Sequence, residues 1–289
     1  MRNYDTLPTL SDTEIIEFCA KGFLMLDGVV SDETNRRTVE FLDEHSDSSD
    51  IFSPIELLNE DWFVDNVVLQ PDAAGAIRSL LGKDFRLPNM MANHRTELPQ
   101  PAQDWHFDGG SMRGHELNYL QVFYYPQECT KDMGPTELLP GSHFLWALRT
   151  YISHLGGIRG TYHSVASAGS IFITVYSIWH RRSASTGSGI RNLLKYNYWR
   201  TVKPERDWII KSDFDIANVD FSVGDFNSVE RPSYRQQFRD CYDSAEMYAW
   251  LSGKHDEFKL LGGQGWPMPN RRLHKWIGRP YGIPEVLQD

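Results

Sequence analysis

The sequence predicts a mainly β protein with flanking helices, whose β core is a barrel or jelly roll. Between about residues 85 and 200, short runs rich in Val, Ile, Phe and Tyr alternate with turns rich in Gly, Pro and Asp. Many short strands at this spacing are typical of a barrel or jelly roll. On either side of this region the apolar residues recur with a helical period. We therefore expect one domain over residues 1–289.

The N-terminal part of the domain, about residues 11–82, is expected to be helical. Ser11 and Glu14 form a capping box at the start of a helix over residues 11–21. Gly22 is placed to end this helix. A short strand at residues 23–26, a second helix at about 31–44 and further helix at 55–82 follow. The polar residues 45–54 between them are either an ordinary surface loop or a lid over a pocket.

The β core, about residues 85–200, contains five runs with the composition of strands. They cover residues 119–125, 136–139, 162–165, 170–176 and 191–198. The C-terminal part, about residues 201–289, contains a predicted helix at 235–255. Its last segment, 262–289, is rich in Gly and Pro, and we expect it to pack along the barrel as an irregular strap.

Composition narrows the class of partner. The formal charge is −10, whereas a nucleic-acid-binding domain usually carries a basic excess. No window approaches 18 uninterrupted apolar residues, and no secretory signal is evident, so we expect a cytoplasmic protein with no membrane contact. The three cysteines, Cys19, Cys129 and Cys241, are expected to be reduced. A small molecule is the expected partner, and the oligomeric state stays open between monomer and homodimer.

The stretch Gln103–Gly110 contains a His-x-Asp pair, His106 and Asp108. Residues i and i+2 of a strand point to the same face, so these two side chains can meet at one point. An imidazole and a carboxylate are two of the three ligands in a 2-His-1-carboxylate iron site. By itself the pair is weak support, because two solvated polar residues in a surface loop give the same pattern.

Two residues further along the chain make the pattern specific. His180 stands 74 residues after His106 at the end of an apolar run, and Arg191 follows eleven residues later. This order and spacing resembles the phytanoyl-CoA dioxygenase-like family of Fe(II)/2-oxoglutarate oxygenases. The Pro-Gly-Ser-His turn at 140–143 and the opening segment 14–30 are also similar to that family. The resemblance spans roughly residues 11–200, and implies a double-stranded β-helix core of the jelly-roll, cupin-like kind.

The resemblance implies the roles of the four residues. His106, Asp108 and His180 would bind Fe(II), and Arg191 would pair with the distal carboxylate of 2-oxoglutarate. The implied reaction consumes O2 and 2-oxoglutarate, releases succinate and CO2 and hydroxylates an unactivated C–H bond, with ascorbate as a reductant. Related halogenases have a small residue at the carboxylate position, so Asp108 favours hydroxylation over halogenation.

Further site residues follow from the resemblance and from strand alternation. Thr136, Gln121 and Asn93 are candidates for hydrogen bonds to 2-oxoglutarate, although each could equally be a satisfied buried polar group. Many relatives carry a hydroxyl residue two positions after the distal histidine, where this chain has Arg182. The hydroxyl is therefore either shifted to Ser183 or absent. The candidate substrate pocket contains Trp105, Met112, Arg113, Trp179 and Arg182. His143 is expected to be structural.

The sequence does not identify the substrate, and we expect a small metabolite of a biosynthetic pathway. Two other classes of protein fit parts of the pattern. One is a jelly-roll metal enzyme that does not use 2-oxoglutarate, such as a cupin-type dioxygenase, isomerase or lyase. The other is a non-catalytic ligand-binding barrel. The first would not need Arg191 in its pocket, and the second would be expected to have lost a metal ligand.

Overall fold

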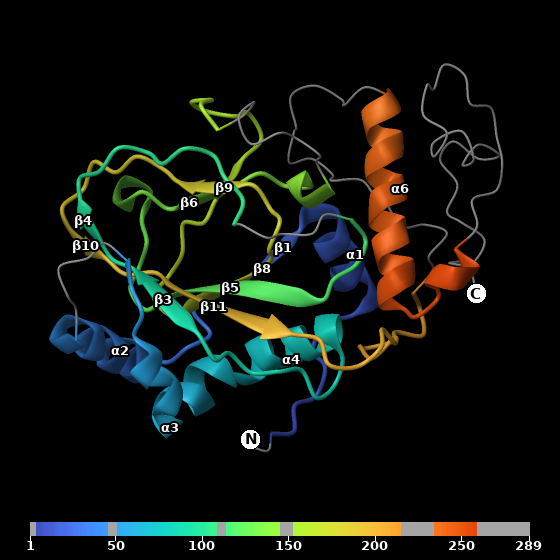
Figure 1. Cartoon of the computed structure of the whole chain (residues 1–289), viewed down its shortest axis with the longest axis horizontal. Coiled ribbons are helices and arrows are strands. Elements are labelled where there is room, and N and C mark those ends of the chain that lie inside the picture. The colour runs from blue at the N-terminus through green and yellow to red at the C-terminus, as the bar shows by residue number, and fades with distance from the viewer. Residues whose placement is uncertain (1–3, 46–50, 109–113, 145–152, 215–233, 259–289) are drawn as a thin grey trace.

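A computed structural model of the chain describes residues 4–45, 51–108, 114–144, 153–214 and 234–258. Its largest element is an antiparallel six-stranded sheet with the order β1-β8-β5-β11-β3-β2 (Figure 1). In that order the strands are β1 (Phe23–Leu26), β8 (Ser170–Val175), β5 (Tyr119–Tyr125), β11 (Leu194–Trp199), β3 (Met91–His94) and β2 (Ile51–Phe52).

A second layer of short strands lies across from this sheet (Figure 1). It contains a three-stranded antiparallel sheet in which β6 (Thr136–Leu138) lies between β7 (Tyr162–His163) and β9 (His180–Arg182). A separate antiparallel pair joins β10 (Gly189–Arg191) to β4 (Thr96–Leu98). These antiparallel sheets confirm the mainly β core expected from the sequence.

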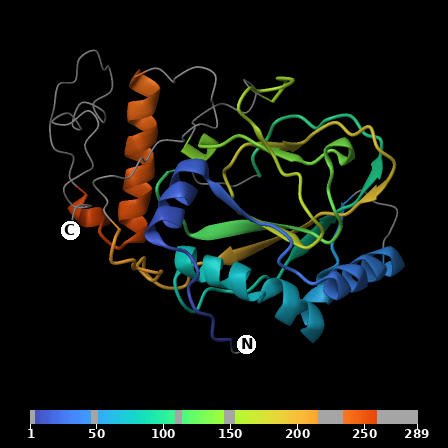
Figure 2. The same ribbon diagram turned by 180° about the vertical axis from the view of Figure 1, so that it is seen from behind.

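Helices cover the other face and one end of the large sheet (Figures 1 and 2). The covering helices are α2 (Asp32–His45), η1 (Ile55–Asn59), α3 (Asp61–Phe63), the π-helix η2 (Val64–Val68) and α4 (Pro71–Leu81). Helices α1 (Asp12–Lys21) and α6 (Tyr234–Leu251) pack against each other at the end of the sheet. Three short 3-10 turns complete the described elements: η3 (Lys131–Met133), η4 (Ser142–Phe144) and η7 (His255–Glu257). None of the described helices is long and apolar enough to span a bilayer.

The buried apolar residues form two clusters, one on each face of the large sheet. The larger cluster fills the space between the large sheet and the helices, and the smaller one, which includes Phe123, Leu138 and Phe172, lies between the two sheets. Strand β8 is therefore buried along its whole length, which explains its continuous apolar run. Cys19 and Cys129 are buried free thiols, as expected; the side chain of Cys241 lies outside the described residues.

The helix signals at the N-terminus are confirmed. The Ser11 amide donates to Glu14 Oε2 at 2.8 Å, which completes the capping box. Gly22 adopts φ 84°, the left-handed conformation that ends many helices. The helical stretch expected at 55–82 is divided into η1, α3, η2 and α4. Residues 46–50 and the strap at 262–289 lie outside the described residues.

Three expected boundaries are wrong. The run leading to His180 is two strands: β8 ends at Val175, and His180 opens β9 in the other sheet. The strand expected over 191–198 is interrupted at Asn192, where the chain leaves β10 and enters β11, and Asn192 is held by the Gln127 side chain. The helix expected at 235–255 ends at Leu251, before the turn η7.

Candidate metal centre and active-site cavity

The three predicted metal ligands converge between the two sheets. Each of His106, Asp108 and His180 offers one ligand atom, and these atoms lie within 4.8 Å of one another. His180 Nε2 is 3.8 Å from Asp108 Oδ2. The two imidazole rings are 4.5 Å apart between centroids and inclined by 58°, so their nitrogens can face a common point. A facial group of two imidazoles and one carboxylate is the donor set of non-haem Fe(II) sites.

The orientation of both histidines is set by the main chain. His106 Nδ1 lies 2.8 Å from the Asp104 carbonyl oxygen, and His180 Nδ1 lies 3.0 Å from that of Ile178. A carbonyl only accepts hydrogen bonds, so in each ring Nδ1 carries the proton and Nε2 keeps its lone pair. Nε2 therefore faces the cluster in both rings, as metal-ligating histidines require.

The Asp108 carboxylate is held in the ionised form. The Gln121 side-chain amide donates to its Oδ2, and Lys195 Nζ lies 3.5 Å from the same oxygen. Burial alone would raise the pKa of Asp108, but the Lys195 ammonium, His180 and the Gln121 amide together hold that pKa well below its usual range. Burial and Lys195 lower the pKa of His180 to about 3, so its imidazole is neutral at physiological pH. Both groups are thus in the protonation state that binds a metal.

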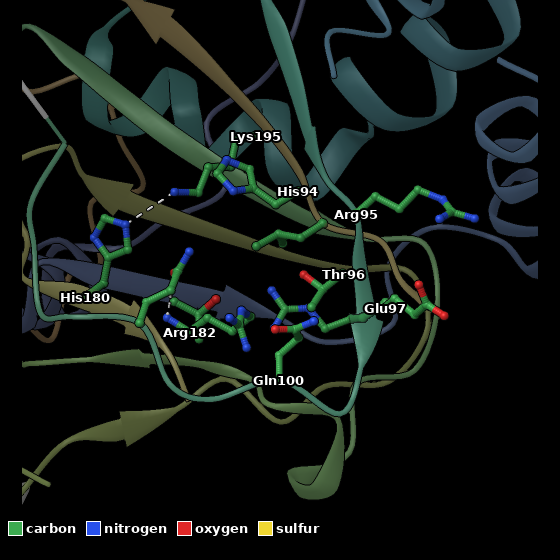
Figure 3. A pocket seen from close by; sticks show the side chains of 12 residues that line it. His94, Arg95, Thr96, Glu97, Gln100, His180, Arg182 and Lys195 are labelled. Carbon is green, nitrogen blue, oxygen red and sulfur yellow. Dashed lines mark hydrogen bonds between the residues drawn. The ribbon is translucent and has the colours of Figure 1, made fainter. Parts of the chain in front are cut away.

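A cavity of about 180 Å³ opens beside this cluster (Figure 3). Its lining comes from the 94–103 segment, from β6, β9 and β10, and from the start of β11. The lining residues are His94, Arg95, Thr96, Glu97, Gln100, Gln103, Thr136, His180, Arg182, Arg191, Leu193 and Lys195. Four of them carry a cationic group and one, Glu97, an acidic group, so the cavity favours an anionic ligand.

Arg191 contributes a fully buried guanidinium to the cavity, with 2% of its surface exposed. It donates to the Gly134 carbonyl oxygen, but its Nε has no hydrogen-bond partner within the described part of the chain. No carboxylate of those residues pairs with it. A buried cation without a counter-charge is unfavourable, so a bound anion would stabilise Arg191.

The other predicted site residues divide into two groups. Thr136 and Arg182 line the cavity, while Gln121 contacts Asp108 instead. The remaining four described residues, Asn93, Ser183, Trp105 and Trp179, are buried outside the cavity lining. Met112 and Arg113 lie outside the described residues.

The contacts of three of these explain their placement. Asn93 donates to Asn192 and accepts from the Leu193 amide, so it supports the crossing from β10 to β11. The Ser183 hydroxyl donates its proton to the Pro135 carbonyl oxygen at 2.8 Å. Trp105 donates to the Gly156 carbonyl oxygen and lies under the Arg181 guanidinium. Each of these side chains contacts protein groups, and the expected ligand contacts stay predictions.

No protein-family model matches the chain, and no curated protein matches it either. Solved structures do match. HygX from Streptomyces hygroscopicus, with nickel and 2-oxoglutarate bound, aligns with a TM-score of 0.55 and 14% identity over 70% of this chain and 90% of HygX. SnoN, a non-heme alpha ketoglutarate dependent epimerase from nogalamycin biosynthesis, aligns with a TM-score of 0.52 and 15% identity over 64% of this chain and 81% of SnoN. The carbocyclase SnoK from the same biosynthesis aligns with a TM-score of 0.50 and 15% identity over 67% of this chain and 87% of SnoK. The chain shares its fold with these proteins.

Sequence reasoning missed Lys195 and His94. Lys195 Nζ lies 3.3 Å from His180 Nε2, and the two side chains point toward each other (Figure 3). Burial and Lys195 lower the pKa of His94, which lines the same cavity, to about 3. A signal for Lys195 was present, because it is the one charged residue in the run Leu193-Leu-Lys-Tyr-Asn-Tyr-Trp199. A lysine within a buried strand seldom lacks a specific partner.

A second group of metal-ligand type joins His115, Glu246 and His255. Glu246 Oε1 is 3.6 Å from His115 Nδ1 and 3.4 Å from His255 Nε2. The two rings are stacked, with centroids 4.0 Å apart and 20° between their planes. Stacked rings direct their in-plane lone pairs side by side, unlike the inclined rings of His106 and His180. This group connects the segment before β5 with α6 and η7.

Proposed function

We propose that the chain is an Fe(II)- and 2-oxoglutarate-dependent oxygenase that hydroxylates an unactivated C–H bond of a small metabolite. The observation that carries this proposal is the convergence of His106, Asp108 and His180 beside a cavity that also contains the buried Arg191. We also infer that the two facing sheets are the halves of a distorted jelly roll, and that the chain is a member of the phytanoyl-CoA dioxygenase-like family.

The ligand group fits a ferrous ion. Two neutral imidazoles with Nε2 facing inward and one ionised carboxylate supply three donors on one side of a metal. This set leaves positions open for a bidentate oxo acid and for oxygen. Proteins of the same fold were solved with iron bound and with nickel and 2-oxoglutarate bound.

The cavity fits 2-oxoglutarate, which is a dianion. The Arg191 guanidinium can pair with the distal carboxylate through two parallel hydrogen bonds, and it stays charged at any working pH. The Thr136 hydroxyl, which accepts from Tyr125 at 3.0 Å, lines the cavity as well and is placed to donate to the same carboxylate. The otherwise unpaired charge of Arg191 would then be neutralised.

With iron, 2-oxoglutarate and O2 bound, the site would couple decarboxylation to succinate and CO2 with oxidation of a C–H bond. The chain's own residues bind and orient the reactants and exclude water. Gln121 fixes the Asp108 carboxylate, and Trp179 and Phe107 pack edge to face behind the ligands, which limits access of water from that side. HygX was also solved with hygromycin B bound, which supports a small-molecule substrate for this chain.

Succinate formation tests the proposal. Purified protein is incubated in air with Fe(II), 2-oxoglutarate and ascorbate, alone and with a panel of small metabolites, and succinate is measured by NMR. We expect iron-dependent succinate release from the wild type and none from Asp108→Ala. Wild-type release no higher than that of Asp108→Ala under every condition would overturn the proposal, as would activity restored by zinc after chelation.

A further inference from the structure

Lys195 brings a largely buried cation next to the candidate metal centre. Its Nζ lies 3.5 Å from Asp108 Oδ2 and 3.3 Å from His180 Nε2, and 11% of the side chain is exposed. The ammonium also lies 4.8 Å from the centre of the Phe123 ring. An atom at these distances from two metal ligands is close to where a small ligand bound to that metal would lie.

Lys195 and Arg191 reach the same cavity from different sheets. Lys195 is opposite Phe123 on β5 and Ala92 on β3, so it lies in the middle of the large sheet. Arg191 ends β10 before the chain crosses to β11, and both residues line the cavity. The cavity thus has two cations in its lining: the largely buried Lys195 beside the candidate metal ligands, and the fully buried Arg191.

A cation in this position opposes metal binding unless an anion lies between the two positive charges. Asp108 supplies one negative charge, which the metal itself would share. A 2-oxo acid that chelates iron supplies a second negative charge, through the carboxylate next to its keto group. Nζ lies within 3.5 Å of two of the candidate ligands, so a carboxylate bound to the metal would be within its reach.

We propose that Lys195 is a second anchor for the 2-oxo acid and binds the carboxylate that chelates the metal, while Arg191 binds the distal one. The inference rests on the proposed function. It makes Lys195 a binding residue for the part of the molecule that every 2-oxo acid contains. Arg191, in contrast, distinguishes 2-oxoglutarate from acids that lack a distal carboxylate.

A merely structural role for Lys195 gives different expectations. If the ammonium only held Asp108 in place, removing it would weaken metal binding. Binding of the oxo acid would then weaken only because less metal is bound. If Lys195 binds the oxo acid, its removal takes a positive charge away from the metal. Metal binding then stays equal or becomes tighter, while binding of the oxo acid becomes weaker. A structural role therefore predicts weaker metal binding, whereas the oxo-acid role predicts metal binding that is unchanged or tighter.

The test combines two variants with two ligands. Wild type, Lys195→Met and Arg191→Met are loaded with Ni(II), and binding of 2-oxoglutarate and of 2-oxovalerate, which lacks the distal carboxylate, is measured by calorimetry. Ni(II) affinity is measured separately for each protein. The exposed Lys131→Met serves as a control for loss of one positive charge, and thermal melting checks that each variant is folded.

We expect Lys195→Met to weaken both oxo acids by the same factor, about ten- to a hundredfold for a charge-assisted hydrogen bond, with Ni(II) binding unchanged or tighter. Arg191→Met should weaken 2-oxoglutarate alone and remove its advantage over 2-oxovalerate. Unchanged affinity of Lys195→Met for both acids, or a loss of Ni(II) affinity that accounts for the change, would overturn the role of Lys195. Wild type that binds neither Ni(II) nor 2-oxoglutarate would instead overturn the proposed function.

Discussion

His106 and His180 are joined by two reciprocal backbone hydrogen bonds. The His106 amide donates to the His180 carbonyl oxygen at 3.0 Å, and the His180 amide donates to that of His106 at 2.8 Å. A single antiparallel bridge thus fixes two candidate ligands that are 74 residues apart in sequence. The backbone bridge holds these two residues side by side without a contribution from either side chain.

This bridge leads to an expectation for His180→Ala. The backbone bridge remains in the variant, so the fold should survive and the melting temperature should shift by only a few degrees. Loss of a ligand should weaken metal binding by more than about a hundredfold, beyond the effect typical of residues that only support a ligand. Metal titration and thermal melting measure the two effects. A variant that keeps wild-type metal affinity would show that His180 is not a ligand.

Gln121 is expected to support Asp108 without touching the metal. Its side-chain amide donates to Asp108 Oδ2, so Gln121→Leu should free the carboxylate to turn and should lower metal affinity about tenfold. Gln70→Leu is a matched control, because Gln70 caps α4 far from the site. The control should lower stability while leaving metal affinity unchanged. Equal metal affinities in wild type and Gln121→Leu would contradict the role of Gln121.

Gly22 is expected to be the less replaceable of two glycines with positive φ. Gly22 and Gly28 have φ of 84° and 61°, so alanine is strained at both, by about 1–2 kcal/mol. A Cβ at Gly22 would also collide with the His143 ring, whereas at Gly28 the nearest atoms are 3.8 Å away. Urea denaturation should therefore show Gly22→Ala to be about 1–3 kcal/mol less stable than Gly28→Ala. Equal stabilities would mean that His143 moves aside without cost.

His143 is expected to make stability depend on pH. Burial lowers its pKa to about 4, partly opposed by the Cys19 carbonyl oxygen 3.0 Å from its Nε2. The unfolded chain, with a histidine pKa near 6.5, binds the proton more readily, so stability falls as pH drops from about 6.5 to 4. The loss from this residue is roughly 2–3 kcal/mol. His143→Gln should reduce the slope of unfolding free energy against pH in that interval, as measured by urea denaturation. An unchanged slope would contradict this assignment.

Much of the fold could be read from local signals. The capping box of Ser11 and Glu14, the left-handed Gly22 and the apolar runs of β5 and β8 each reflect interactions within a few residues or continuous burial of one strand. These signals remain valid in the structure because packing agrees with them. The convergence of His106, Asp108 and His180 was also predictable, since the first two are placed two residues apart and His180 follows at a recognisable spacing.

The rest of the fold and of the candidate site depends on contacts between residues that are far apart in the sequence. The chain changes sheet between Val175 and His180, and the mostly apolar run there does not mark the change. Segment 94–103 contributes five cavity residues besides His94, yet nothing in its composition distinguishes it from an ordinary loop. Trp105 is predicted to line a pocket, but in the structure it lies under the Arg181 guanidinium and outside the cavity lining.

The most direct test of the central claim is an anaerobic titration of Fe(II)-loaded protein with 2-oxoglutarate, followed by visible absorption. Chelation of a 2-oxo acid to a ferrous ion held by three facial ligands produces a weak charge-transfer band. We expect this band to develop with saturation in the wild type and to be absent in His106→Ala. Wild type that binds iron but develops no band at any 2-oxoglutarate concentration would show that the metal centre is real and that the oxo acid is not its partner.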